Sequence, residues 1–283
     1  MEIKSLGEID FDTIFDAFSR AFADYELQLD KNQLRAMLQR RGFNPDLSFA
    51  AFDKNQIAAF TFNGIGNFNG IATAYDTGTG TLKEYRGKGL ATKIFEHSIP
   101  YLRKEGIKQY LLEVLQYNTK AISVYRKLGF NTIREFNYFR QKNEKINFDL
   151  PTHNIEYPVR KINMENFKLP DAFGDFHPSW QNSLESIQRD INSFVCLGAF
   201  SDDKLIGYCV FEPNSGDITL IAVDKENRRK GIASLLLKEV ALLNKNDSIK
   251  IINTDISCSS ITNFLKAKNI EITGTQFEMI KEL

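Results

Sequence analysis

The chain has 283 residues, enough for roughly two domains of about 100–200 residues each. Its hydrophobic content of 42% and its charged content of 25% are ordinary for a globular protein, and 36 basic residues balance 36 acidic ones, so no overall field attracts nucleic acid or an anionic membrane. The three cysteines all lie in one half and the three histidines are scattered. The sequence shows neither a leader-like N-terminus nor an apolar run long enough to cross a bilayer. We therefore expect a cytoplasmic protein without disulfides, metal, nucleic-acid partner or membrane contact.

Helical periodicity opens the first half, with aromatic residues on one face that we expect to pack in a core: Phe11, Phe15, Phe18 and Phe22. Three strand candidates follow, at 47–52, 57–62 and 71–82. The third contains Gly78 and Gly80, which suggest a bulge or a close backbone approach. An amphipathic helix then begins near residue 90, and Pro100 predicts that it kinks or ends early.

The second half repeats this order of elements. Strand candidates at 194–200, 205–211 and 217–223 precede an amphipathic helix from residue 232. Each helix follows a similar loop, Arg86 to Ala91 in the first half and Arg228 to Ala233 in the second, 142 residues further on. The polar stretch from Lys142 to Pro158 has little periodicity and predicts a linker, so we expect domains at 1–145 and 155–283.

The repeated loop has the chemistry of an anion site. It joins a strand to a helix, whose first turn leaves N–H groups free, and its glycines let an anion approach the backbone. A Walker A loop is excluded because Leu82 stands where its first glycine belongs. A dinucleotide fingerprint is excluded because Thr92 replaces its third glycine.

The two loops resemble the Q/R-x-x-G-x-G/A motif of the GNAT acetyltransferase superfamily, as Arg86-x-x-Gly89-x-Ala91 and Arg228-x-x-Gly231-x-Ala233. A second block, Leu112-Glu113-Val114 followed by Asn118, Ala121, Tyr125, Gly129 and Phe130, resembles the strand and helix that follow in that family. The resemblance implies an α+β fold with two tandem GNAT-like domains. Each would have a twisted, mostly antiparallel sheet flanked by helices, with a gap between its fourth and fifth strands.

The resemblance also implies an N-acetyltransferase that moves the acetyl group of acetyl-CoA directly to an amine. Tyr125 would protonate the leaving thiolate and Glu113 would accept the amine proton, with Asp76 a weaker candidate base. A backbone N–H near Thr81 or Leu82 would bind the acetyl carbonyl, and Asn118 would lie at the cofactor. The implied cofactor loops are Arg86, Gly87, Lys88, Gly89, Leu90 and Ala91, and Arg228, Arg229, Lys230, Gly231, Ile232 and Ala233.

Aligning the halves on the end of the second helix predicts that they differ in function. Tyr125 then falls on Leu265, Glu113 on Asn253 and Asn118 on Cys258. A leucine cannot donate a proton and an amide is no base at neutral pH. We therefore expect the second half to bind CoA without catalysis or to serve a structural role.

The acceptor is not readable from the sequence beyond a small-molecule or peptide amine, and the chain could act as a monomer or a homodimer. Aromatic residues before the first sheet, Phe18, Phe22 and Tyr25, could wall the acceptor site or simply pack, and packing is also the simpler role for Trp180. The alternative function is a non-catalytic acyl-CoA-binding or sensing module with the same fold.

Overall fold

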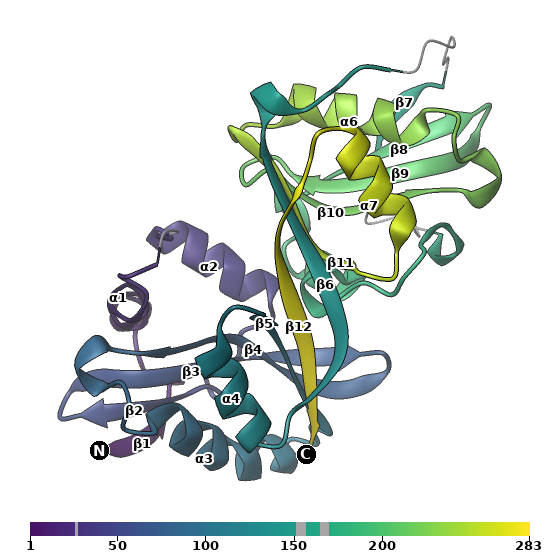
Figure 1. The fold of residues 1–283 in the computed structure, drawn as a ribbon. Helices are drawn as coiled ribbons and strands as arrows, with labels where there is room; N and C mark the ends of the chain where they lie inside the picture. Colours follow the sequence, from purple (N-terminus) through teal and green to yellow (C-terminus); the bar gives the residue numbers. More distant parts are fainter. Residues whose placement is uncertain (26–27, 151–156, 165–169) are drawn as a thin grey trace. The chain divides into compact units, whose positions relative to one another are not determined.

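The computed structural model describes residues 1–25, 28–150, 157–164 and 170–283 of the chain (Figure 1). Contacts divide them into two compact units. The first unit is Met1–Ile133 with Leu184–Arg189 and Phe277–Leu283, and the second is Arg134–Ser183 with Asp190–Gln276. In the described part of the chain, no helix has the length and apolar character needed to cross a membrane.

The first unit is built on a mixed sheet. Its strands are, in spatial order, β1 (Glu2–Ser5), β2 (Phe49–Asp53), β3 (Gln56–Phe68), β4 (Ile71–Thr81), β5 (Gln109–Leu115) and the last part of β12 (Ile272–Glu282). Strands β1 to β4 pair antiparallel, and β4 pairs parallel with β5. Its helices are α1 (Phe11–Ala21), α2 (Lys31–Arg40), α3 (Leu90–Lys104), α4 (Thr119–Lys127) and the short α5 (Leu184–Arg189).

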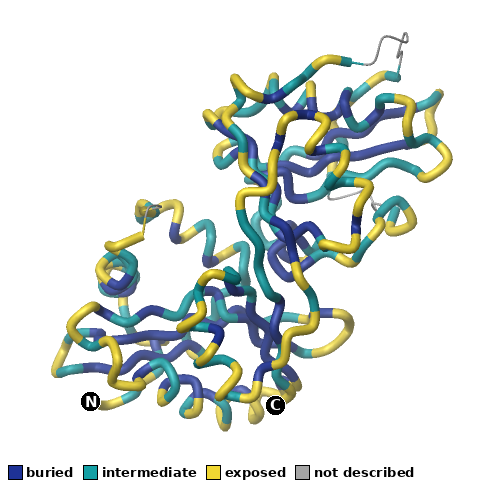
Figure 2. Tube along the Cα trace, in the orientation of Figure 1, coloured by how far each residue is buried: buried dark blue, intermediate teal, exposed yellow. Residues whose placement is uncertain are grey.

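Helices cover both faces of this sheet, and each face has its own apolar core. Figure 2 marks the buried segments of the chain. Helices α1 and α2 pack on Phe60 and Phe62, while α3 and α4 pack with Tyr110 and Phe130. Capping side chains start the first two helices: Asp10 accepts from the backbone of α1, and Asp30 forms a capping box with Gln33 of α2.

The sequence predicts that Pro100 kinks or ends this helix early, but α3 does not end there and continues to Lys104. A proline leaves the carbonyl one turn earlier without its helical donor. Here that carbonyl belongs to Glu96, and Glu96 and Pro100 are both exposed, so water can replace the lost hydrogen bond.

The second unit has the same plan with one strand supplied by the first half of the chain. Its strands are, in spatial order, β6 (Asn131–Lys142), β11 (Ser248–Asp255), β10 (Asp217–Val223), β9 (Lys204–Glu212), β8 (Val195–Ser201) and β7 (Val159–Ile162). Helices α6 (Ile232–Leu243) and α7 (Ser259–Ala267) pack on a core that includes Phe139 of β6 and Phe211 of β9. Short 3-10 turns complete the fold, among them η3 (Asp171–Phe173), η4 (Trp180–Asn182) and η6 (Lys225–Asn227).

The halves therefore exchange strands. From Phe136 onward, β6 pairs antiparallel with β11 of the second unit. In return, the last residues of β12 lie beside β5 in the first unit, where Met279 is fully buried and the Leu283 N–H donates to the Lys108 carbonyl. The fold is α+β as expected. Residues 151–156 of the expected linker lie outside the described residues. The domain limits of 1–145 and 155–283 stay a prediction, because the division into compact units does not show which piece folds alone.

Candidate active site

The central feature of the first unit is a gap between β4 and β5. The described ladder between these parallel strands runs only from Thr73–Gln109 to Tyr75–Leu111, although β4 continues to Thr81. A bulge begins where the ladder stops, because the β3–β4 register shifts at Thr77, which is paired with no residue in the ladder register of β3. The bulged half of β4 thus leaves β5 and opens the sheet.

The backbone of β4 presents donors to this gap. The Leu82 N–H donates to the Ala58 carbonyl of β3 over 3.0 Å, and Thr81 lies opposite Ala59. Bonded and non-bonded pairs alternate along an antiparallel ladder, so Thr81 and Thr79 direct their N–H groups away from β3, to the side of the gap. Of the two backbone donors expected from the sequence, Thr81 is the one that faces the gap.

Two glycines let this half of β4 lie close to aromatic rings of β3 and α1. An added Cβ on Gly80 would lie 2.4 Å from the Phe60 ring, and on Gly78 it would lie 3.8–3.9 Å from Phe62 and Phe18. The rings of Phe60 and Phe62 stack with centroids 4.2 Å apart. The glycines therefore mark both features expected from the sequence, a bulge nearby and a close approach.

The two expected catalytic side chains reach the gap from opposite faces of the sheet. Ala74 packs in the core under α3 and α4, so its neighbour Tyr75 points to the α1–α2 face and Asp76 to the α3–α4 face. The fully buried Tyr75 hydroxyl donates to Glu113 Oε2 over 2.9 Å. Burial first, and then the charge of Glu113, raise the pKa of Tyr75 well above its usual value, so this hydroxyl stays a donor that orients Glu113.

On the opposite face the Tyr125 hydroxyl donates to Asp76 Oδ2 over 2.9 Å. Because Thr77 is bulged, Asp76 and Thr79 share a face, and the same oxygen accepts the Thr79 hydroxyl at 2.9 Å while Oδ1 accepts the Gly78 N–H. Burial raises the pKa of Asp76 despite these donors. Burial, followed by the charge of Asp76, raises the pKa of Tyr125 well above its usual value, so the phenol keeps its proton at neutral pH.

The arginine loop leads from β4 into α3. Arg86 donates to the carbonyls of Thr81 (3.1 Å) and Ala21 (2.9 Å) and to Asp24 Oδ2 (3.0 Å), and so ties β4 to the end of α1. Because Arg86 is committed to these contacts, an anion would be bound by the backbone N–H groups of the loop. Gly87 and Gly89 have φ of +79° and +70°, and an added Cβ on either would meet nothing within 4 Å.

The start of α3 completes this cradle. Among the described residues, no side chain caps the helix at Gly89, so its first N–H groups are available to an anion. Leu90 is buried and anchors the helix in the core beside Ile94. Exposed Lys88 lies with Nζ 4.8 Å from the Tyr85 ring centroid. An open loop of two left-handed glycines before an uncapped helix fits a diphosphate, as the sequence predicts for Gly87 to Ala91.

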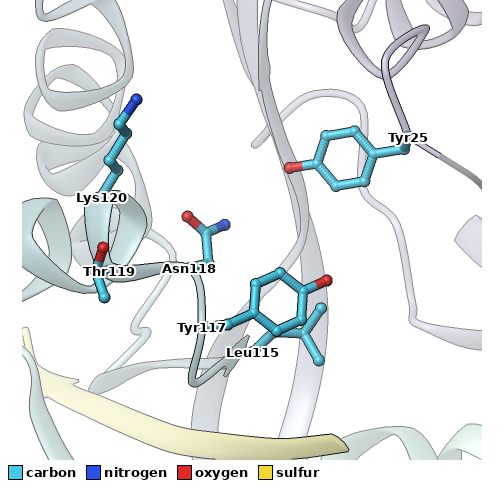
Figure 3. A pocket seen from close by; sticks show the side chains of 6 residues that line it. All are labelled: Tyr25, Leu115, Tyr117, Asn118, Thr119 and Lys120. Atoms are coloured by element: carbon cyan, nitrogen blue, oxygen red, sulfur yellow. The ribbon is translucent and has the colours of Figure 1, made fainter.

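A cavity of about 260 Å³ lies beyond the end of β5 (Figure 3). It is lined by Tyr25, Leu115, Tyr117, Asn118, Thr119 and Lys120. Asn118 caps α4 by accepting the Ala121 N–H, and Tyr25 faces it from the opposite wall. Of the expected aromatic wall only Tyr25 lines the cavity, since Phe18 and Phe22 pack on the core. The 75%-exposed Tyr117 was missed, although its place between β5 and α4 was a signal.

The second unit repeats the arginine loop. Arg228 donates to the carbonyls of Val223 (3.1 Å) and Phe173 (3.0 Å) and forms an ion pair with Asp175 at 2.9 Å. Gly231 takes the left-handed conformation of Gly89, with φ of +83°, and Arg229 takes that of Gly87, with φ of +65°. In this loop Ile232 is buried in the core, and Lys230 bonds Asn227.

Among the described residues, the second gap has no ionisable group at the positions of Tyr125 and Glu113. Strands β10 and β11 have one parallel pair, Asp217–Lys250, and β10 is bulged at Thr219, the same distance before Arg228 as Thr77 is before Arg86. Leu265 is buried and is the seventh residue of a nine-residue helix, the position that Tyr125 has in α4. Cys258 stands at the Asn118 position but caps nothing with its side chain among the described residues.

One pair in the alignment of the halves is wrong. Asn253, with φ of +57°, sits at a bulge in β11, where the register with β6 shifts between Ile251 and Thr254. The Tyr75–Leu111 pair of the first unit corresponds to the Asp217–Lys250 pair of the second. Glu113 lies two residues after Leu111, so it matches Ile252, two residues after Lys250, rather than Asn253. An ungapped alignment hides this extra residue, but neither residue carries a carboxylate.

Side chains of the same unit occupy the region of the second gap. Asn182 of η4 donates to the Ile252 carbonyl over 2.9 Å, and Asn253 donates to Ser179 over 2.9 Å. Trp180 between them is 1% exposed, which confirms packing as its role. Asp175 accepts both Arg228 and the Ser260 hydroxyl of α7, so it joins the loop to the next helix. In the described parts of both units, no group of His, Cys, Asp and Glu could hold a metal ion.

Comparisons with known proteins agree with this geometry. A model described as the acetyltransferase (GNAT) family matches residues 11–130, and one described as an acetyltransferase (GNAT) domain matches residues 168–263. The N-alpha-acetyltransferase 30 of Schizosaccharomyces pombe is 32% identical over 87 residues, which are 30% of this chain and 58% of that one. The [ribosomal protein bS18]-alanine N-acetyltransferase of Escherichia coli is 43% identical over 58 residues, 20% and 38% of the two chains.

The matched stretches span 35–58% of the length of the first curated relatives. Among solved structures, a tandem GNAT protein from the clavulanic acid biosynthesis pathway is similar over 99% of this chain and 98% of its own, with a TM-score of 0.74 at 13% identity. A GCN5-related N-acetyltransferase from Sphaerobacter thermophilus has a TM-score of 0.72 over 99% and 95%, also at 13% identity. These likenesses show the fold, and together with the two family models they lead to one conclusion: the chain belongs to the GNAT family of acetyltransferases.

Proposed function

We propose that the first unit is an acetyl-CoA-dependent N-acetyltransferase that carries its acetyl group directly to the amine of a small molecule or peptide. The observation that supports this most is the gap between β4 and β5, with Glu113 held on one face and Tyr125 on the other. Amine acetylation needs a base on the acceptor side and an acid on the thiol side, and the gap separates two such groups.

Acetyl-CoA, when bound, supplies the thioester that the amine attacks. The N–H groups of Gly87 to Ala91 hold its diphosphate, with Lys88 adding charge. The Thr81 N–H, directed to the gap, donates to the acetyl carbonyl and stabilises the charge that develops there. Glu113, oriented by Tyr75, accepts the proton of the amine, and Tyr125 protonates the sulfur.

For the acceptor, we propose the α-amine of a peptide as the first class to test. The curated relatives include an N-alpha-acetyltransferase and a ribosomal-protein alanine N-acetyltransferase. The second unit would take no part in the chemistry, because its described residues supply neither ionisable group at the matching positions.

Two measurements on the full chain test this proposal. Calorimetry with acetyl-CoA should give saturable binding, and no heat with any CoA thioester would refute the cofactor assignment. A screen with short peptides, amino acids, polyamines and aminoglycosides should then find an acceptor that gains one acetyl group while CoA thiol is released. Direct attack predicts intersecting initial-rate lines when both substrates are varied, whereas parallel lines would indicate an acetylated enzyme. Tight binding without transfer to any acceptor would favour the non-catalytic alternative.

A further inference from the structure

The hydrogen bond between Tyr125 and Asp76 raises a problem of charge. If Tyr125 alone gave its proton to the sulfur while Asp76 was ionised, a phenolate and a carboxylate would face each other at the 2.9 Å of their present contact. Two adjacent anions in a half-buried site are strongly unfavourable. The same donation costs far less when Asp76 carries a proton that it can pass on.

We propose that Tyr125 and Asp76 act as one proton donor to the leaving thiolate, with Asp76 as the reservoir. The Tyr125 O–H bond breaks as the S–H bond of CoA forms, and the Asp76 carboxylic acid then gives its proton to the Tyr125 oxygen. The pair ends as a neutral phenol hydrogen-bonded to a carboxylate, the state with one negative charge. Asp76 regains its proton from water before the next turnover. This rests on the proposed function, and Asp76 is a positioning and proton-holding residue that acts through Tyr125.

The surroundings of the pair favour this role. On β4 the Gly78 N–H and the Thr79 hydroxyl both donate to Asp76, and so hold its carboxyl group toward Tyr125. The guanidinium of Arg41, which follows α2, is the cation that acts on Asp76. The charges of Asp76 and Tyr125 act on Tyr110 of β5, and the charge of Tyr25, which follows α1, acts on Tyr125.

Glu113 stands apart from this pair, because it is held by Tyr75 on the opposite face of the sheet. The acceptor side and the thiol side thus have separate proton-carrying groups. A reservoir on the thiol side is therefore not interchangeable with the base on the amine side.

A first test needs no turnover. Tyrosinate absorbance is followed as pH is raised in the wild type, Asp76→Asn and Asp76→Asn/Tyr125→Phe, with circular dichroism limiting the range to folded protein. Because the carboxylate raises the pKa of Tyr125, Asp76→Asn should ionise one tyrosine at lower pH than the wild type, and the double variant should lose that extra signal. Coincident curves for the wild type and Asp76→Asn would overturn the pairing.

The second test uses the acceptor found in the screen. Wild-type kcat should fall as pH rises through the pKa of Asp76, since the reservoir must be protonated. Asp76→Asn should remove that alkaline fall and lower kcat at the optimum by roughly 10–100-fold, with little change in the KM for acetyl-CoA. The double variant should be no slower than Tyr125→Phe, because the two residues form a unit. An unchanged alkaline limb in Asp76→Asn, or losses that multiply in the double variant, would refute the relay.

Asp53→Asn is the matched control, because Asp53 accepts the Tyr85 hydroxyl at 2.7 Å in a second Tyr–Asp pair, outside the gap. Its pH profile and kcat should match the wild type, and an equal loss there would assign the effect to stability. Failure of the proposed function looks different: no CoA thioester binds and no acceptor is modified, while the tyrosinate titration still reports on the pair.

Discussion

The two units share an arginine loop and differ in the gap beside it. Arg86 and Arg228 make the same set of contacts, two to backbone carbonyls before them in the chain and one to an aspartate. At the gaps, the first unit has Tyr125 and Glu113, while the second has Leu265 and a buried 3-10 turn whose Asn182 bonds the strand. The arginine is thus explained by folding alone in both units.

This difference teaches what the motif reports. A guanidinium committed to two carbonyls and a carboxylate holds a strand end and a helix end together, whatever the unit does later. A match to the motif therefore indicates the loop and the fold, whereas activity has to be judged from the groups at the gap.

The largest expected difference between the units is in turnover. Tyr125→Phe should lower kcat by about 10²–10⁴-fold with little change in KM for acetyl-CoA, because only the proton donor is removed. Leu265→Met, at the same helix position of the second unit, is a volume-conserving control and should leave kcat unchanged. Equal losses of kcat in the two variants would refute the proposal that only the first unit carries out the chemistry. The measurement is initial rates with saturating acceptor.

Next comes cofactor affinity. The glutamate of Arg86→Glu cannot donate to the Thr81 and Ala21 carbonyls, and its carboxylate would repel that of Asp24. Because it also places a negative charge near the diphosphate, acetyl-CoA should bind at least about tenfold more weakly. Arg228→Glu should leave the affinity within about twofold, and calorimetry should give one site per chain. A stoichiometry of two that falls to one in Arg228→Glu would show that the second loop binds the cofactor.

A smaller effect concerns packing under β4. Gly80→Ala should lower the free energy of unfolding by about 1–3 kcal/mol, since its Cβ would overlap the Phe60 ring. Gly78→Ala makes only ordinary contacts and should change it by less than about 0.5 kcal/mol. The second unit carries Ala222 at the place of Gly80. Denaturant unfolding measures both variants, and equal changes would exclude the ring as the cause.

The smallest effect is a pH dependence in the second unit. Burial acts to raise the pKa of Asp175, but hydrogen bonds from Ser260 and Arg228 outweigh it and lower the pKa below its ordinary value. The resulting stability, up to about 1 kcal/mol, is present above the ordinary pKa and is lost as pH falls through the lowered one. The unfolding free energies of the wild type and Asp175→Asn should therefore differ near neutral pH and converge in acid. A constant difference would contradict this role.

Local features of the sequence predicted much of this molecule. The glycines and the helix start at residues 87–91 fix the loop because they act within a few residues. Aligning the halves at the helix end matched Leu265 to Tyr125, and this match holds because α4 and α7 have the same length. What the sequence did not predict depends on distant pairing. A one-residue bulge at Asn253 displaced the match of Glu113. Gly78 and Gly80 suggested a bulge in β4, but they did not show that it lies at Thr77 and brings Asp76 to Tyr125.

The exchange of strands could not be read from periodicity either, because β6 and β12 have the same alternation whichever sheet they join. It has a consequence for synthesis. The residues from Phe277, which complete the sheet of the first unit, are translated after the whole of the second unit. During synthesis the sheet of the first unit therefore has an open edge beside β5 until the end of the chain is made. A gene cut between the halves would encode two pieces that each lack a strand.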